Sequence, residues 1–231
     1  MSPATAELTA INDLKTEIEA LLTPGADKAV RFGAADEPLR KSQVEALQAI
    51  REALEQGRRL THIVMPGGAG KTRIGIALAN AMNQKGRQSL FVIPSQQALT
   101  DFAEKAQALC PELNVGRVYQ GEKRIGNLTF ITYASLMQRI LGEEASEEVK
   151  EQAQIDEEYA REHHQAKRAK SDLVIDPHAF DLVVWDEAHM YLTPHAQELV
   201  SQFDHAVNIG MTATPRYYEG KEVSNVFGEC A

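Results

Sequence analysis

The sequence predicts an α/β protein with a mostly parallel β-sheet and helices on both faces of that sheet. Short apolar segments alternate with amphipathic segments along the 231 residues. The apolar segments are apolar throughout rather than at every second position. Both features are typical of parallel strands that helices bury on two sides. The length is enough for one large domain or two small ones.

The helical segments carry apolar residues at spacings of three and four, so that one face of each is apolar. The first lies within residues 1–24 and predicts an N-terminal amphipathic helix that ends at Thr23-Pro24-Gly25. Further helices are expected at 39–57, 70–86, 95–110, 134–141 and 193–203. Ser95 and Thr193 are the expected N-caps, because their hydroxyls can accept hydrogen bonds from the first turn.

The strands are short, apolar segments, several of them rich in β-branched residues. They are expected at 60–65, 89–93, 115–119, 128–133, 181–185 and 206–213. Residues 25–231 therefore predict one α/β unit, with the polar segment 143–170 inserted into it. Acids dominate the first half of that segment and bases the second, an order that suits a helix macrodipole. It predicts either a protruding helical arm or a partly disordered insertion.

Composition and charge exclude several classes of protein. No apolar run approaches the ~20 residues of a membrane span, and the N-terminus lacks the layout of a signal peptide. The two cysteines, Cys110 and Cys230, have no metal-ligand spacing, and we expect reduced thiols in a cytoplasmic protein with no membrane partner. The formal net charge of -9 argues against a chain-wide electrostatic grip on nucleic acid. A local basic groove stays compatible with it.

Residues 65–72, Met-Pro-Gly-Gly-Ala-Gly-Lys-Thr, lie between an expected strand and an expected helix. This is the setting of a phosphate-binding loop, in which glycines let the backbone direct N–H groups at phosphate oxygens. The helix N-terminus adds a favourable dipole. Lys71 is placed to reach the β- and γ-phosphates, and the Thr72 hydroxyl to ligate Mg²⁺. The alternative is a plain glycine turn before an amphipathic helix, which three glycines in this setting disfavour.

Two adjacent acids, Asp186 and Glu187, follow the apolar strand at 181–185. Buried carboxylates are costly unless they are paired, and a magnesium nucleotide needs an anchor across the sheet from the loop. Asp186 is placed to hold Mg²⁺ through water. Glu187 is then the candidate general base, or the residue that orients water, for attack on the γ-phosphate. Alternatively, the acids form a helix N-cap with first-turn charge.

In order along the chain, these motifs resemble those of the first RecA-like lobe of superfamily 2 helicases and translocases. The matching segments are 39–47 (adenine recognition), 65–72 (motif I, with Met65 in place of the first glycine), 91–99 (motif Ia), 131–136 (motif Ib/Ic), 185–189 (motif II, DEAH form) and 210–217 (motif III). They cover most of the chain, and motifs I and II are highly specific together. The "LRxxQ", "DEAH" and "TATPR" forms lean towards the branch with restriction-enzyme motor subunits and DNA translocases.

The resemblance implies a RecA-like P-loop NTPase fold that binds ATP and Mg²⁺. It assigns nucleotide binding to Gln43, Gly67, Gly68, Ala69, Gly70, Lys71 and Thr72. It assigns the metal to Thr72 and Asp186, and catalysis to Glu187, Lys71 and Asp186.

In the family, the motif III strand lies between the strands that carry motifs I and II. His189, Thr212 and Thr214 would then couple the γ-phosphate state to motif III. The plain alternatives are an interior histidine and a strand end capped by small polar residues. Ser95, Gln96 and Thr132 would contact nucleic-acid phosphates, or else serve as helix caps and loop hydroxyls.

The expected function is the ATP-binding lobe of an ATP-dependent nucleic-acid helicase or DNA translocase, with DNA favoured over RNA. No segment like motifs IV to VI follows motif III, and residues 217–231 are expected to be a short tail. We therefore expect the second RecA-like lobe, with its arginine finger, to be absent here and supplied by a parent protein or in trans. The isolated lobe should hydrolyse ATP weakly or not at all.

The alternative function is a nucleotide-dependent regulatory or protein-interaction module on a P-loop fold, without motor activity. Motifs Ia, Ib and III separate the two hypotheses, because a plain nucleotide switch does not need them. The sequence is compatible both with a natural short protein and with a shortened form of a longer protein.

Overall fold

The main sheet of the computed structural model has seven strands in the order β3-β9-β8-β4-β7-β5-β6. The structure describes residues 3–23, 31–119, 122–140, 173–215 and 222–231. The strands expected from the sequence are β3 (Leu60–Val64), β4 (Ser89–Ile93), β5 (Val115–Val118), β7 (Leu128–Thr132), β8 (Leu182–Asp186) and β9 (Val207–Thr212). These six run parallel, and β6 (Lys123–Arg124) joins antiparallel at one edge. The predicted α/β class is confirmed.

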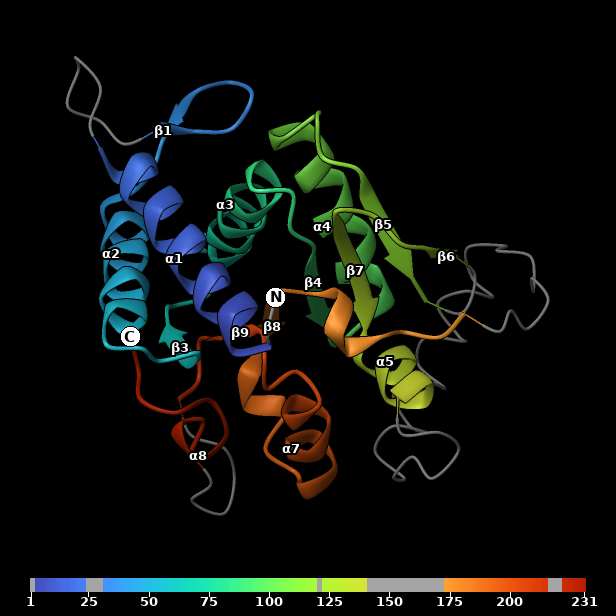
Figure 1. Ribbon diagram of the computed structural model, residues 1–231. Coiled ribbons are helices and arrows are strands. Elements are labelled where there is room, and N and C mark those ends of the chain that lie inside the picture. The colour runs from blue at the N-terminus through green and yellow to red at the C-terminus, as the bar shows by residue number, and fades with distance from the viewer. Residues whose placement is uncertain (1–2, 24–30, 120–121, 141–172, 216–221) are drawn as a thin grey trace.

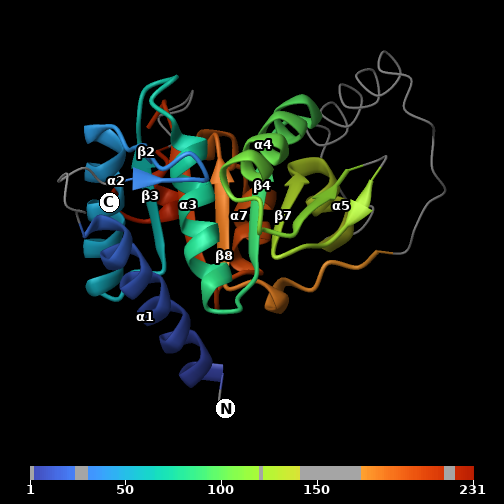
Figure 2. The same cartoon turned by 90° about the horizontal axis from the view of Figure 1, so that it is seen from above.

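Helices cover both faces of the sheet, as the apolar strands predicted. They are α1 (Pro3–Leu22), α2 (Lys41–Glu55), α3 (Lys71–Gln84), α4 (Gln96–Leu109), α5 (Tyr133–Ile140), α7 (Pro194–Ser201) and α8 (Ser224–Phe227). Figure 1 shows α1 to α4 on one side of the sheet and α5, α7 and α8 on the other, and Figure 2 shows the same layers from above. Ser95 and Thr193 are N-caps as predicted, accepting from the backbone N–H of Ala98 and Ala196.

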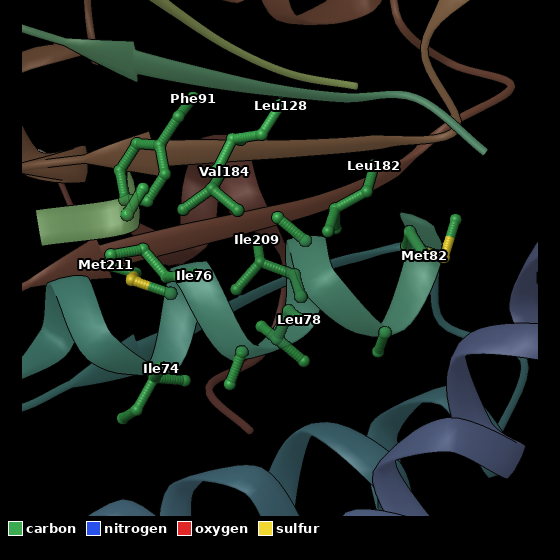
Figure 3. Packing of buried hydrophobic residues seen from close by; sticks show 14 of the residues in the cluster. Ile74, Ile76, Leu78, Met82, Phe91, Leu128, Leu182, Val184, Ile209 and Met211 are labelled. Carbon is green, nitrogen blue, oxygen red and sulfur yellow. The ribbon is translucent and has the colours of Figure 1, made fainter. Parts of the chain in front are cut away.

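Each face of the sheet has its own apolar core. On the first face, α3 lies over the strands, with Ile76 beside Met211 of β9 (Figure 3). Gly75 makes this approach close, because a Cβ there would lie 2.5 Å from the ring of Phe91. The second core, under α5, α7 and α8, includes the fully buried Trp185. The six parallel strands end on the same side of the sheet, where loops connect them to the following elements.

Helix α1 packs into the first core rather than standing apart from it. Leu14 and Ile18 are fully buried beside α2 and α3. Arg87 adds an ion pair to α1, with its Nε 2.7 Å from Asp13 Oδ2, and a second to the start of β8, with its Nη1 2.6 Å from Asp181 Oδ1. The domain boundary at residue 24 stays a prediction, since the helix and the lobe share one core.

Several short elements, β6 among them, were not expected from the sequence. A hairpin of β1 (Arg31–Phe32) and β2 (Glu37–Pro38) precedes α2. The expectation of a short tail at 217–231 was incomplete, because residues 222–231 pack on the lobe: Phe227 is fully buried, and Ala231 N–H donates to His62 O at 2.8 Å beside β3. The apolar residues Val223, Val226 and Phe227 drive this packing.

The predicted insertion at 143–170 lies outside the described residues. Of the helices within the described ranges, none has the length and apolar character needed to cross a membrane.

Candidate nucleotide-binding and hydrolysis site

The loop of residues 65–70 connects β3 to α3, as the phosphate-loop pattern predicted. Gly68 and Gly70 adopt φ of 74° and 90°, a left-handed backbone that favours glycine. A Cβ added at Gly67 or Gly68 would meet no atom within 4 Å, so this side of the loop is open to a ligand. The loop ends at the N-terminus of α3, whose free N–H groups and dipole favour an anion.

Met65 occupies the place of the first glycine in the motif without disturbing the loop. Its side chain is buried in the core, and its N–H donates to Thr212 O at 2.8 Å, which extends the pairing of β3 with β9. Its carbonyl accepts a hydrogen bond of 3.3 Å from Lys71 Nζ. The loop therefore holds the lysine ammonium beside its own backbone.

The acid pair lies at the carboxyl end of β8, opposite this lysine. Asp186 is the last residue of the strand and is only 6% exposed. Burial, together with the negative charge of Glu187, raises its pKa to about 7, and Lys71 opposes that rise. Glu187 has a left-handed backbone, with φ 51° and ψ 52°, which is uncommon for a residue with a side chain and is found more often at functional sites. Its Oε1 lies 3.9 Å from Lys71 Nζ.

His189 and Thr212 join the acid motif to the end of β9. His189 Nδ1 lies 2.9 Å from Thr212 Oγ1 and 3.4 Å from Glu187 Oε2. The Thr212 hydroxyl donates to Thr214 O at 3.0 Å and accepts from Thr214 N–H at 2.9 Å. A hydroxyl has one proton and two lone pairs, so the proton shared with His189 belongs to Nδ1. The prediction that β9 lies between β3 and β8 is confirmed.

Gln43 reaches the loop from α2. It is 2% exposed, and its Nε2 donates to the carbonyls of Ala69 at 3.2 Å and Gly70 at 3.4 Å, while its Oε1 accepts from Arg40 N–H. A Cβ at Gly70 would collide with this amide, which is a second reason for glycine there. The structure thus brings Gln43 to the loop backbone, and its contact with adenine stays a prediction.

The three residues assigned to nucleic acid follow β4 or end β7: Ser95 and Gln96 lie at the start of α4, and Thr132 is the last residue of β7. Ser95 caps α4 and is half-buried. Gln96 and Thr132 are about 1% exposed, and the Thr132 hydroxyl bonds Ser135 Oγ at 2.9 Å at the start of α5. These contacts fit the helix-cap interpretation, and the contact with phosphates stays a prediction.

The residues present fit a magnesium ion that takes some of its ligands from the protein and the others from a nucleotide and water. Thr72, in the first turn of α3, and Asp186 offer the hard oxygen donors that Mg²⁺ prefers. The buried Asp186 carboxyl, with its raised pKa, is a group that a nearby cation would stabilise in its charged form. In the part of the chain that the structure describes, no group of three His, Cys, Asp or Glu could hold a metal alone. Mg²⁺ at such sites takes its other ligands from phosphates and water.

The sequence analysis did not identify two arginines, one that contacts the loop and one that follows it in α3. Arg40 Nη1 donates to Gly68 O at 2.8 Å, and Arg73 binds the β1–β2 hairpin. Both stand inside or next to recognised motifs, since Arg40 belongs to "LRxxQ" and Arg73 follows Thr72. Their position in the sequence therefore indicated that they lie near the site. Their partners are backbone carbonyls, and no pattern of residue types reveals such partners.

Comparisons with known proteins identify the family and the fold. The family model described as "Type III restriction enzyme, res subunit" matches residues 36–217. The DNA 3'-5' translocase XPB2 of Sulfurisphaera tokodaii is 24% identical over 189 residues, which are 80% of this chain. The chain spans only 34% of the length of that relative.

Solved structures share the fold. The UvsW helicase of bacteriophage T4 superposes with a TM-score of 0.61 at 14% identity, over 93% of this chain and 66% of that one. The Sulfolobus solfataricus SWI2/SNF2 ATPase core, solved with dsDNA, gives 0.51 at 17% identity, over 78% of this chain and 32% of that one. The type ISP restriction-modification enzyme LlaGI, solved with a DNA substrate mimic, gives 0.53 at 17% identity, over 84% of this chain and 19% of that one.

Together with the order of the motifs on the sheet, the match over residues 36–217 establishes the family. The chain belongs to the type III restriction enzyme res-subunit family and is a RecA-like lobe of the superfamily 2 helicases and translocases.

Proposed function

We propose that this chain binds Mg-ATP and supplies the hydrolytic base and part of the nucleic-acid track of an ATP-dependent DNA translocase or helicase. One observation carries the proposal. Three adjacent strands, β3, β9 and β8, bring Lys71, Thr212 and the acid pair to the same edge of the sheet. The carboxyl edge of parallel strands is where such sheets bind their ligands.

Each side chain has a distinct role in the proposed reaction. Lys71 and the loop N–H groups bind the β- and γ-phosphates and stabilise the charge that develops there. Glu187 accepts the proton of the attacking water, while His189, 3.4 Å away, helps to orient its carboxylate. Thr72 and Asp186 would hold Mg²⁺, which when bound would neutralise charge on the phosphates. Thr212 links this group to the backbone of Thr214, where motif III begins to leave the sheet.

The polymer is proposed to be DNA, because the XPB2 relative is a DNA translocase and two of the structural neighbours were solved with DNA. Ser95, Gln96 and Thr132 are proposed to lie along its track. Rapid turnover is proposed to need a second RecA-like lobe, from a parent protein or in trans. An arginine finger supplied by another element raises the rate of such hydrolysis by a factor of about 10³–10⁵.

The experiment that tests the function is a titration of labelled single-stranded DNA and RNA at low salt. Each titration is done with and without a non-hydrolysable ATP analogue. DNA affinity that changes with the analogue supports the motor lobe. If the protein binds the analogue but neither polymer, the alternative of a regulatory P-loop module replaces it.

A further inference from the structure

Arg73, in the first turn of α3, binds the β1–β2 hairpin rather than the phosphate loop. Its Nη2 donates to Phe32 O at 2.6 Å and to Glu37 O at 2.9 Å. Phe32 and Glu37 are cross-strand partners, so one guanidinium nitrogen closes the hairpin at that pair. Nη1 also lies 3.4 Å from the Glu37 carboxylate, but that carboxylate is 61% exposed and contributes little. The backbone acceptors therefore carry the contact.

The chain that leaves the hairpin returns to the phosphate loop within a few residues. Arg40 donates to Gly68 O at 2.8 Å, and Gln43 donates to Ala69 O at 3.2 Å. The contacts thus form a closed ring, which runs from the loop through α3 and Arg73 to the hairpin and back through the Arg40–Gln43 segment. Lys71 Nζ points to the Met65 carbonyl and the Glu187 carboxylate, whereas Arg73, two residues later, points to the hairpin.

We propose that Arg73 is a positioning residue for the base-and-ribose half of the nucleotide. By fixing the hairpin it fixes the Arg40–Gln43 segment, which forms the wall beside the loop. In this proposal the phosphates contact the loop and Lys71, while base and ribose lie along the Arg40–Gln43 segment, which contacts the loop carbonyls. This inference rests on the proposed binding of ATP.

A purely structural arginine would affect all ligands equally, so the test compares two ligands. Isothermal titration with Mg²⁺ present measures the affinity for ATP and for inorganic tripolyphosphate, which lacks base and ribose. We expect Arg73→Ala to weaken ATP about tenfold and tripolyphosphate less than twofold. Arg73→Lys keeps the positive charge but lacks the planar fork, so it should weaken ATP and leave tripolyphosphate unchanged. That variant separates hairpin positioning from simple charge, and it serves if Arg73→Ala folds poorly.

The matched control is Arg51→Ala, which removes an arginine that pairs only with Glu55 on α2 in the described contacts. It should bind both ligands as the unaltered protein does. The inference is overturned if Arg73→Ala and Arg73→Lys leave ATP affinity unchanged, or weaken both ligands by the same factor. If the unaltered protein binds neither ligand, the proposal of ATP binding fails as well, and that outcome is distinct from failure of Arg73 alone.

Discussion

Lys71 Nζ lies 3.9 Å from Glu187 Oε1, although the two residues belong to motifs that lie far apart in the sequence. The strand order places β3 and β8 on either side of β9, which brings the loop of one to the end of the other. Asp186 and Thr212 complete the group. Lys71 counters the rise in pKa of Asp186, and Thr212 holds His189 beside Glu187. The consequences of these contacts can be tested one residue at a time.

Replacing Glu187 with Gln should separate hydrolysis from binding. The amide fills the same space but accepts no proton, so residual ATP hydrolysis should fall by about 10²–10⁴ while nucleotide affinity is kept. Hydrolysis is measured by phosphate release and affinity by titration calorimetry. Glu198→Gln, on the exposed face of α7, is the matched control and should hydrolyse normally. Full activity in Glu187→Gln would remove Glu187 from the role of base.

Replacing Thr212 with Val should destabilise the lobe through lost hydrogen bonds. Thr212 is fully buried, and valine keeps its shape but removes the hydroxyl that bonds Thr214 N–H and His189 Nδ1. Thr214 is exposed and His189 is half-buried, so we expect each lost hydrogen bond to cost about 0.5–1.5 kcal/mol. Thr212→Ser keeps the hydroxyl and loses one methyl, so it should be the milder change. Urea unfolding measures both, and a valine variant as stable as the serine variant would contradict the network.

The pH dependence of stability should carry the signature of Asp186. Its pKa of about 7 in the folded protein exceeds the ordinary value of 3.8, so folding favours the protonated form. This group therefore reduces stability progressively as pH rises from about 4 to about 7, and the loss is constant above that. Asp186→Asn removes the ionisation. It should match the unaltered protein near pH 4 and be more stable at pH 8, by up to about 4 kcal/mol at about 1.4 kcal/mol for each unit of pKa.

Thermal or urea unfolding across that pH range, without nucleotide or metal, tests this prediction. Asp204→Asn is the control, since its side chain is 82% exposed and should leave the profile unchanged. An Asp186→Asn variant that is less stable than the unaltered protein at pH 8 would show that Asp186 is paired in its charged form.

The sequence predicted the central sheet because its strands are apolar on both faces, a pattern that few other folds share. It predicted the loop and the acid pair because Gly70-Lys71-Thr72 and Asp186-Glu187 each have a strand before them. The hairpin at 31–38 was missed because its strands have two residues each and show no periodicity. The docking of Phe227 was missed because a four-residue helix has too few positions to reveal an apolar face. The contacts of Arg40 and Arg73 depend on where backbone carbonyls lie, which only the folded chain determines.

The central claim is that the loop and the acid pair form one Mg-ATP site. Its most direct test is calorimetric titration of this chain with a non-hydrolysable ATP analogue, in Mg²⁺ and in EDTA, for the unaltered protein and for Lys71→Ala. Lys105→Ala is the control, because that lysine is exposed on α4 and belongs to neither the loop, the acid pair nor the Arg40–Gln43 segment. We expect one saturable site that needs Mg²⁺ for full affinity, is kept in Lys105→Ala and is lost in Lys71→Ala. Binding that is absent in the unaltered protein, or unchanged in Lys71→Ala, would contradict the account.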